Sequence, residues 1–361
     1  MLIWIVGIVV ALVVIALAAG LYLQGPDMRR YDVPAVDQAQ PVRQHFSTGD
    51  APNTEHRAVI AMLGGITTAV KGIPFSQQLG VLRTYMDNLM AHRVLNAQFT
   101  PVDVGGVAAE WVLAPGADPQ RRTLYIHGGA WMMGSPRSHR VITAKFSEVT
   151  GGTVLAIDYR LMPEHRRMAG IEDCRSAYRW LLDNGPEGRA SATAVFVAGD
   201  SAGGNLTLSL IAWVRDQGLR APTAAIALSP ATDATLGSPS LRANVATDAM
   251  LGPMFGKLAK VPRMFLVWAS VFQNRIAPNR AVVSPLFGDL SGLPPTLIHA
   301  SSVEMLRDDS VRYANKAAAS GSPVTLQTWN HTVHVWHLFD PELTEARQAF
   351  EEIRQFVARV G

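Results

Sequence analysis

The chain has 361 residues and a formal net charge of +3, with 48% hydrophobic and 17% charged residues. This composition excludes a disordered chain, and the length allows a large core in one embellished domain or in two domains. No basic block interleaved with aromatic residues is present, so nucleic-acid binding has no support. Cys174 is the only cysteine, which excludes an internal disulfide and a cysteine-based zinc site.

The chain begins with an apolar segment that carries no charge. Residues 2–23 are long enough to cross a bilayer as one helix, with Trp4 and Tyr22 near its two ends. A cleaved signal peptide is the alternative, because residues 16–18 (Ala-Leu-Ala) resemble a cleavage site. No basic residue precedes the run and its apolar character continues past that site. We therefore predict an uncleaved transmembrane anchor over residues 1–24, in the inner membrane of a bacterium.

The residues after the anchor bear on its orientation. Arg29 and Arg30 favour a cytoplasmic catalytic part by the positive-inside tendency, but Asp27 and Asp32 beside them leave the side of the membrane open. Residues 25–98 show no clear strand alternation, and residues 76–97 have helical spacing. We interpret 25–98 as N-terminal cap and linker helices.

From residue 99 onward, short apolar strands alternate with helices, which predicts an α/β class with a mostly parallel central sheet. The expected strands are residues 107–113, 122–126, 153–158, 193–198, 224–229, 295–299 and 324–329. The expected helices are residues 138–149, 171–184, 205–214 and 341–360. We interpret 99–361 as one catalytic domain. Residues 235–279 interrupt the alternation and are rich in Met and aromatic residues, so they are expected to form a cap insertion that lines an apolar pocket.

A nucleophile motif lies at residues 199–203. The sequence Gly-Asp-Ser-Ala-Gly follows an apolar strand and precedes a buried helix, which is the context of a nucleophile elbow with Ser201 exposed at the turn. A glycine-rich turn with a structural serine is the alternative. A serine hydroxyl near neutral pH needs an adjacent base that a carboxylate orients.

The base and the acid are expected downstream of Ser201, in the order serine, acid, histidine. His334 follows the last expected strand and is the best base, whereas His299 lies within a strand. His331 and His337 flank His334, but no third ligand at suitable spacing completes a metal site. Glu304 follows the strand at 295–299 and is the leading acid. Asp308 is the reserve, since it and Asp309 fall in the next helix.

Small residues that follow directly on an expected strand predict an oxyanion hole. Gly128, Gly129 and Ala130 allow backbone N–H groups to converge on a developing oxyanion. The N–H of Ala202, the residue after the nucleophile, is expected to join them.

Together these motifs resemble the hormone-sensitive-lipase-like family of bacterial esterases (family IV). The segments that carry the resemblance are HGGAW at 127–131, DYRLMPEH at 158–165, GDSAGG at 199–204, SPL at 284–286, EMLRDDS at 304–310 and HVW at 334–336. The resemblance implies an α/β-hydrolase fold with a helical cap and hydrolysis of short-chain carboxylic esters without a cofactor or metal. It also implies roles for Ser201 as nucleophile and His334 as base, and structural roles for Asp158 and Glu164. Three features depart from the family pattern: Ala130 in place of a third glycine, Glu304 where Asp is common, and the N-terminal anchor.

The leading hypothesis is a membrane-anchored serine carboxylesterase that acts on small-molecule esters through an acyl-enzyme. An amidase or acyltransferase that uses the same triad is one alternative, since the triad does not fix the leaving group. A catalytically silent binding module is another, although Ser201, Glu304 and His334 are all present. The oligomeric state stays open, with a homodimer as one option.

Overall fold

The computed structural model describes residues 2–34, 39 and 41–361. Its centre is a nine-stranded sheet with the strand order β1-β11-β10-β9-β8-β4-β5-β3-β2. The strands are β1 (Val42–Phe46), β2 (Gln98–Asp103), β3 (Ala108–Leu113), β4 (Asp118–Ile126), β5 (Gly152–Ile157), β8 (Ala194–Asp200), β9 (Ala224–Leu228), β10 (Thr296–Ser301) and β11 (Val324–Trp329). In this strand order, every neighbouring pair from β1 across to β5 is parallel. At the other edge β3 is antiparallel to β5, and β2 is antiparallel to β3. A separate short pair joins β6 (Asn184–Gly185) to β7 (Gly188–Arg189).

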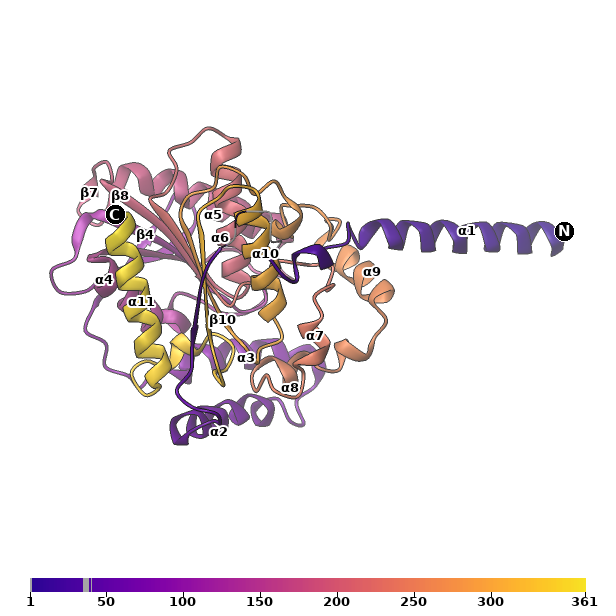
Figure 1. Ribbon diagram of the computed structural model, residues 1–361, viewed down its shortest axis with the longest axis horizontal. Coiled ribbons are helices and arrows are strands. Elements are labelled where there is room, and N and C mark those ends of the chain that lie inside the picture. The colour runs from indigo at the N-terminus through magenta and orange to yellow at the C-terminus, as the bar shows by residue number, and fades with distance from the viewer. Residues whose placement is uncertain (1, 35–38, 40) are drawn as a thin grey trace.

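Helices cover both faces of the sheet (Figure 1). On one face, α4 (Arg140–Thr150) and α11 (Thr344–Val360) pack against it, and on the other α5 (Arg167–Asp183), α6 (Ala202–Asp216) and α10 (Arg307–Ala319) do so. The central strands are mostly apolar because both of their faces are buried, and every residue of β9 is buried. The α/β class and the mostly parallel sheet are therefore confirmed.

Two strands lie where the sequence indicated none. β1 pairs with β11 at one edge, and β2 forms the opposite edge. Four of the five residues of β1 are exposed, so it has no apolar face, and Pro101 interrupts the pattern of β2. Edge strands tolerate both features, which is why their residues do not show strand periodicity. The interpretation of residues 25–98 as helices alone is wrong at β1.

The remaining helices lie outside the sheet. In Figure 1, α2 and α3 run along the lower side near α7 and α8, and α9 lies at the right beside α1. Their bounds are α2 (Thr54–Ala69), α3 (Phe75–Leu89), α7 (Ser240–Ala243), α8 (Leu251–Phe255) and α9 (Arg263–Asn274). Short 3-10 helices are η1 (Arg29–Tyr31), η2 (Arg137–His139), η3 (Leu258–Lys260), η4 (Pro285–Phe287) and η5 (Trp336–Phe339). The division at residues 24 and 98 into anchor, cap and catalytic domain stays a prediction.

The aromatic residues of the insertion do not all line a pocket. Phe265 and Phe272 of α9 are 66% and 64% exposed. Met264 and Trp268 of the same helix instead lie against Gly20 in α1 (Leu2–Leu23). The expectation that the bulky residues of 235–279 enclose an acyl pocket is wrong for these four side chains.

Helix α1 projects away from the rest of the protein (Figure 1). Its residues Trp4–Leu23 are long and apolar enough to cross a membrane, a property that signal sequences and anchors share. Only its last turns contact the body of the protein, where Gly20 and Leu23 are buried. From residue 4 to residue 18, every side chain of the helix is exposed.

Candidate active site

Ser201 occupies a sharp turn between β8 and α6. Its backbone has φ 52° and ψ −115°, a conformation that costs on the order of 1–3 kcal/mol in a non-glycine residue. Neighbouring elements hold it there, since the Ser201 N–H donates to the Leu228 carbonyl at 2.7 Å. A Cβ on Gly199 or Gly203 would lie 2.5 or 1.9 Å from the Ile126 carbonyl oxygen. The two glycines are therefore required for the turn to pass so close to β4.

The structure brings Ser201, His334 and Glu304 together in one hydrogen-bonded line. His334 Nε2 lies 2.9 Å from Ser201 Oγ, and His334 Nδ1 lies 2.6 Å from Glu304 Oε2. Three segments supply them: the elbow, the loop after β10 and the loop after β11. An ionised carboxylate only accepts hydrogen bonds, so the Nδ1–H donates to Glu304 and Nε2 is left to accept the hydroxyl proton of Ser201. This is the geometry of a nucleophile, a base and an orienting acid.

The Glu304 carboxylate is shielded from solvent and held in place by hydrogen bonds. Glu304 is fully buried, and its Oε1 accepts the Ser301 N–H at 2.8 Å. Residues of the insertion at 235–279 hold the same loop, because Asn244 Nδ2 donates to the Glu304 carbonyl at 2.8 Å and Asp248 accepts the Met305 N–H at 2.8 Å. A displacement of the insertion would therefore move the carboxylate that orients His334.

The charge of Glu304 sets the protonation of His334. Burial acts to lower the pKa of His334, but the hydrogen bond and the charge of the Glu304 carboxylate outweigh it, and the pKa is raised above 6.5. A raised pKa means that the imidazole accepts a proton more readily, as a general base must.

The other candidate acids and bases have different partners. Asp308 Oδ2 accepts the Ser240 N–H at 2.8 Å and Asp309 Oδ2 accepts the Thr232 N–H at 2.6 Å, so both fix the loop that leads into the insertion. His299 lies within β10, 3.0 Å from His337 Nε2, and burial lowers its pKa to about 3. His331 Nε2 lies 3.3 Å from the Gly49 carbonyl oxygen. None of these side chains makes a hydrogen bond to Ser201 or Glu304 within the described residues.

The predicted oxyanion loop follows β4 and faces the elbow, with one difference. The Gly128 N–H donates to Asp200 Oδ1 at 3.1 Å, so Gly128 is not available as the donor that the sequence predicted. The N–H groups of Gly129, Ala130 and Ala202 reach no protein acceptor within the described part of the chain. Gly129 and Ala130 have φ values of 112° and 54°, which turn the backbone sharply at this point.

Comparisons with known proteins agree with this geometry. The sequence profile of the alpha/beta hydrolase fold matches residues 123–338. The chain is 37% identical to an acetyl-hydrolase from Streptomyces hygroscopicus, over 71% of this chain and 81% of that protein. It is 35% identical to the carboxylesterase/phospholipase LipF from Mycobacterium tuberculosis, over 72% of this chain and 68% of that protein.

Solved structures point to the same group. A crystal structure of an esterase from the bacterial hormone-sensitive lipase family has a TM-score of 0.74 and 32% identity, covering 86% of this chain and 99% of that one. The esterase EstE5, soaked with p-nitrophenyl butyrate, has a TM-score of 0.72 and 36% identity, covering 85% of this chain and 98% of its own. The chain belongs to the hormone-sensitive lipase family of α/β-hydrolase esterases. It is a carboxylesterase and thus a serine hydrolase.

Sequence reasoning missed a buried polar cluster beneath the elbow of this esterase. Asp200, which directly precedes Ser201, accepts a hydrogen bond from Tyr125 Oη at 2.7 Å and lies 3.3 Å from His139 Nε2. Burial acts to raise the pKa of Asp200, but His139 outweighs it and the pKa is lowered. Because Asp200 also binds the Gly128 N–H, it ties the oxyanion loop to the elbow. The only sequence signal for a role of Asp200 was its position inside the motif at residues 199–203.

A second brace involves Trp131 and Arg167. The Trp131 Nε1–H donates to the Ala202 carbonyl at 3.2 Å, and the Arg167 guanidinium lies 3.6 Å from the centre of the Trp131 ring. Arg167 Nη2 donates to Asn205 Oδ1 at 2.9 Å, and burial lowers the pKa of Arg167 to about 9. The start of α6 and the oxyanion loop are thus cross-linked at a second point.

Proposed function

We propose that this carboxylesterase is membrane-anchored and hydrolyses esters with short acyl chains through an acyl-enzyme on Ser201. The observation that carries the proposal is the continuous line from Ser201 Oγ through His334 to Glu304, with distances of 2.9 and 2.6 Å. The short-chain preference is supported by relatives named as an acetyl-hydrolase and as an esterase soaked with a butyrate ester.

In the first half-reaction, Ser201 Oγ attacks the ester carbonyl as His334 Nε2 takes the hydroxyl proton. The N–H groups of Gly129, Ala130 and Ala202 stabilise the negative charge that develops on the carbonyl oxygen. The tetrahedral intermediate collapses when the protonated His334 gives its proton to the departing alcohol, which leaves an acyl group on Ser201. In the second half-reaction, His334 activates water, and the acid is released while Ser201 is regenerated.

Hydrolysis of p-nitrophenyl esters over a series of acyl lengths tests these roles. We expect Ser201→Ala, His334→Ala and Glu304→Ala to lower kcat by on the order of 10³-fold or more, with the wild type fastest on short chains. His92→Ala and Asp216→Ala are the matched controls, because both side chains are exposed and neither contacts the triad or its supporting loops within the described residues. If Glu304→Ala retained activity while Asp308→Ala lost it, the assignment of the acid would be overturned.

The membrane anchor is supported by the exposed apolar surface of α1 and by a length of 22 residues, about 33 Å, against a hydrocarbon thickness of about 30 Å. We expect the full chain to stay in the membrane fraction after alkaline carbonate extraction and to keep its N-terminal residues in mass spectrometry. A soluble protein that starts after Ala18 would contradict the anchor and leave the catalytic proposal intact.

A further inference from the structure

Helix α9 has a large apolar surface that the protein leaves uncovered. Phe265 and Phe272 are 66% and 64% exposed, and Ala269 between them is exposed as well. These three residues follow the spacing i, i+4, i+7 and form one stripe along the helix, which we call the outer stripe. The only charged residue within α9 is Arg263, and it points inward to the Thr235 carbonyl at 2.9 Å. The other polar residues of α9 are Ser270, Gln273 and Asn274, so the helix has an apolar side and a polar side, as helices that lie at a lipid interface do.

The side of α9 next to the outer stripe is fixed to the end of α1, and the Trp268 ring lies 6.2 Å from the Phe272 ring of the stripe. A Cβ on Gly20 would lie 2.0 Å from Met264 Sδ and 3.1 Å from Trp268 Nε1, so α9 packs directly on the backbone of α1. Figure 1 shows α9 beside the base of the projecting helix. Because α1 has 22 residues, Gly20 lies within one turn of its end and therefore near the boundary of the hydrocarbon layer.

Side chains of the insertion also hold the turn that ends α1. Arg263 Nη2 donates to the Gln24 carbonyl at 2.9 Å, and Asn279 Nδ2 donates to the Tyr22 carbonyl at 2.8 Å. The last carbonyls of a helix lack partners within it, so these two bonds cap α1 from the two ends of the segment that contains α9. The position of α9 relative to α1 is thereby fixed at both ends.

We propose that the outer stripe of α9 lies in the interfacial layer of the same bilayer that α1 crosses. This inference rests on the proposed membrane anchor. The partner is a lipid surface, because the stripe continues from a helix of the same apolar character and needs no second protein to cover it. Lys260 and Arg275 are exposed just before and just after α9, where their charges can reach lipid phosphates.

The placement also bears on the substrate. Gln273, next to Phe272, donates through Nε2 to Met132 Sδ at 3.5 Å, and the Met132 N–H donates to the Gly129 carbonyl at 3.1 Å. The outer stripe is thus connected to the oxyanion loop through two residues, Gln273 and Met132. The substrate class that this arrangement serves is an ester dissolved in the bilayer, with a long apolar alcohol that keeps it there and a short acyl group that reaches Ser201.

Depth-dependent fluorescence quenching tests the inference on the full chain. Cys174 is buried, so a single introduced cysteine takes up an environment-sensitive nitrobenzoxadiazole label selectively. The labelled variants are Phe265→Cys and Phe272→Cys in the outer stripe, Leu12→Cys inside α1, and Val94→Cys, which replaces a side chain 99% exposed in the loop before β2. Each is reconstituted in vesicles of phosphatidylcholine and phosphatidylglycerol that contain doxyl-labelled lipid.

We expect strong quenching at positions 12, 265 and 272 and none at position 94, with shallow doxyl groups most effective at 265 and 272. Quenching at position 12 with none at 265 and 272 would overturn the inference and leave the anchor standing. No quenching at position 12 would overturn the anchor and the inference together.

An activity measurement supplies a second readout. The double variant Phe265→Ser/Phe272→Ser is expected to hydrolyse vesicle-dissolved dodecyl acetate several-fold more slowly than the wild type while its rate on soluble p-nitrophenyl acetate stays unchanged. The double variant Ile60→Ser/Met62→Ser, which replaces exposed apolar residues of α2, is the matched control and should leave both rates unchanged. Equal rates for the wild type and the α9 variant on dodecyl acetate would overturn the assignment of the substrate class.

Discussion

At the scale of single residues, the reactivity of Ser201 depends on groups that cannot move independently. The elbow is fixed by Gly199 and Gly203, and the carboxylate that orients the base is enclosed without solvent. Asp200 connects the elbow to the oxyanion loop through the Gly128 N–H. Preorganisation of this kind stabilises a transition state because no reorientation is needed as charge develops.

The pH dependence of ester hydrolysis reports the effect of Glu304 on His334. In the proposed mechanism neutral His334 is the active base, so kcat/KM should fall as the pH drops through its pKa, which the Glu304 carboxylate raises above 6.5 against the effect of burial. In Glu304→Gln the carboxylate is lost and burial remains. We therefore expect the acidic limb to shift to lower pH and the plateau to fall by on the order of 10²–10⁴-fold. An acidic limb that stays in place in the variant would contradict this account.

The two glycine-to-alanine changes Gly203→Ala and Gly80→Ala should have opposite effects on stability. At Gly203 a Cβ would lie 1.9 Å from the Ile126 carbonyl oxygen, and backbone cannot yield without separating α6 from β4. We expect a loss of at least about 3 kcal/mol in the free energy of unfolding, or no folding. At Gly80, within α3, nothing lies within 4 Å, so alanine should add about 0.5–1 kcal/mol. Thermal unfolding in detergent measures both, and a neutral Gly203→Ala would refute the steric argument.

At the scale of elements, the sequence was sufficient to predict those strands and turns whose residues are buried along their whole length. The buried central strands and the elbow were identifiable because apolar runs and a tight glycine turn have local signatures. β1 was not, since four of its five residues are exposed and its partner β11 lies near the other end of the chain. Motif order was likewise enough to predict that Ser201, Glu304 and His334 meet, whereas the engagement of the Gly128 N–H by Asp200 depends on two loops meeting in space.

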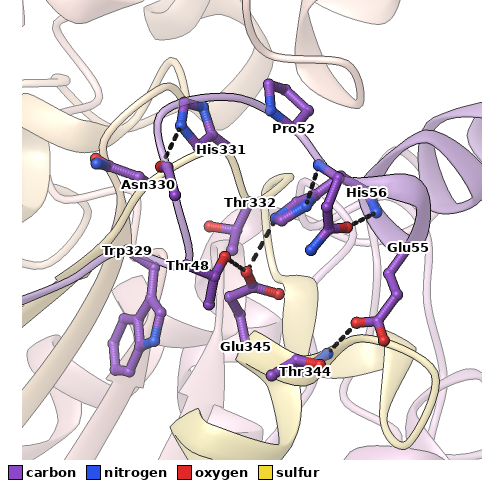
Figure 2. A network of polar contacts seen from close by, with 12 residues as sticks. Thr48, Pro52, Glu55, His56, Trp329, Asn330, His331, Thr332, Thr344 and Glu345 are labelled. Atoms are coloured by element: carbon purple, nitrogen blue, oxygen red, sulfur yellow. Dashed lines mark hydrogen bonds and ion pairs between the residues drawn. The ribbon is translucent and has the colours of Figure 1, made fainter.

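The N-terminal segment is joined to the catalytic part by a polar network (Figure 2). Thr48 and His56 both contact the carboxylate of Glu345 in the first turn of α11, with His56 Nε2 at 3.3 Å from Oε1. Asn330 and His331, in the loop that carries His334, bond to the same N-terminal segment through its backbone and side chains. The position of the loop that carries His334 is therefore supported by residues 46–49 of the N-terminal segment.

Glu345→Ala should destabilise the chain far more than Glu351→Ala on the same helix. Glu345 is 1% exposed, and its loss leaves the buried His56 without its partner carboxylate, which costs about 1–3 kcal/mol. Glu351 forms an exposed ion pair with Arg354 and accepts a long, exposed hydrogen bond from Gln355, so its loss should cost less than about 1 kcal/mol. Thermal unfolding of the two variants compares them directly, and equal destabilisation would show that the network contributes nothing.

The same carboxylate has a pH-dependent effect with a definite sign. Burial acts to raise the pKa of Glu345, but hydrogen bonds from His56 and Thr48 outweigh it and lower the pKa below 4.5. A lowered pKa in the folded state means that the stabilisation is present above pH 4.5 and is lost as the pH falls through the folded-state value. The stability difference between the wild type and Glu345→Gln should therefore shrink on acidification. A difference that grows instead would contradict the assignment.

At the scale of the whole molecule, the end of α1 is part of the folded body rather than a free tether. Two α1 variants test this: Gly20→Leu, where a Cβ would lie 2.0 Å from Met264 Sδ, and Gly7→Leu, where nothing lies within 4 Å. We expect Gly20→Leu to weaken packing by about 1–2 kcal/mol, so that local opening becomes about tenfold more frequent. Tryptic cleavage after Arg29 and Arg30 should then accelerate in Gly20→Leu only. Equal cleavage rates in the two variants would show that α1 is not docked.

The pairing of β1 with β11 also sets an order of events during synthesis. His45 of β1 and Thr328 of β11 are 283 positions apart, so β1 leaves the ribosome long before its partner exists. At typical elongation rates that interval is roughly 15–60 s. Throughout it, residues 42–56 cannot form the contacts with His331, Thr344 and Glu345 that Figure 2 shows. The nascent chain therefore holds an unpaired segment until its last tenth is being translated, and that segment is open to a chaperone or a protease for the whole interval.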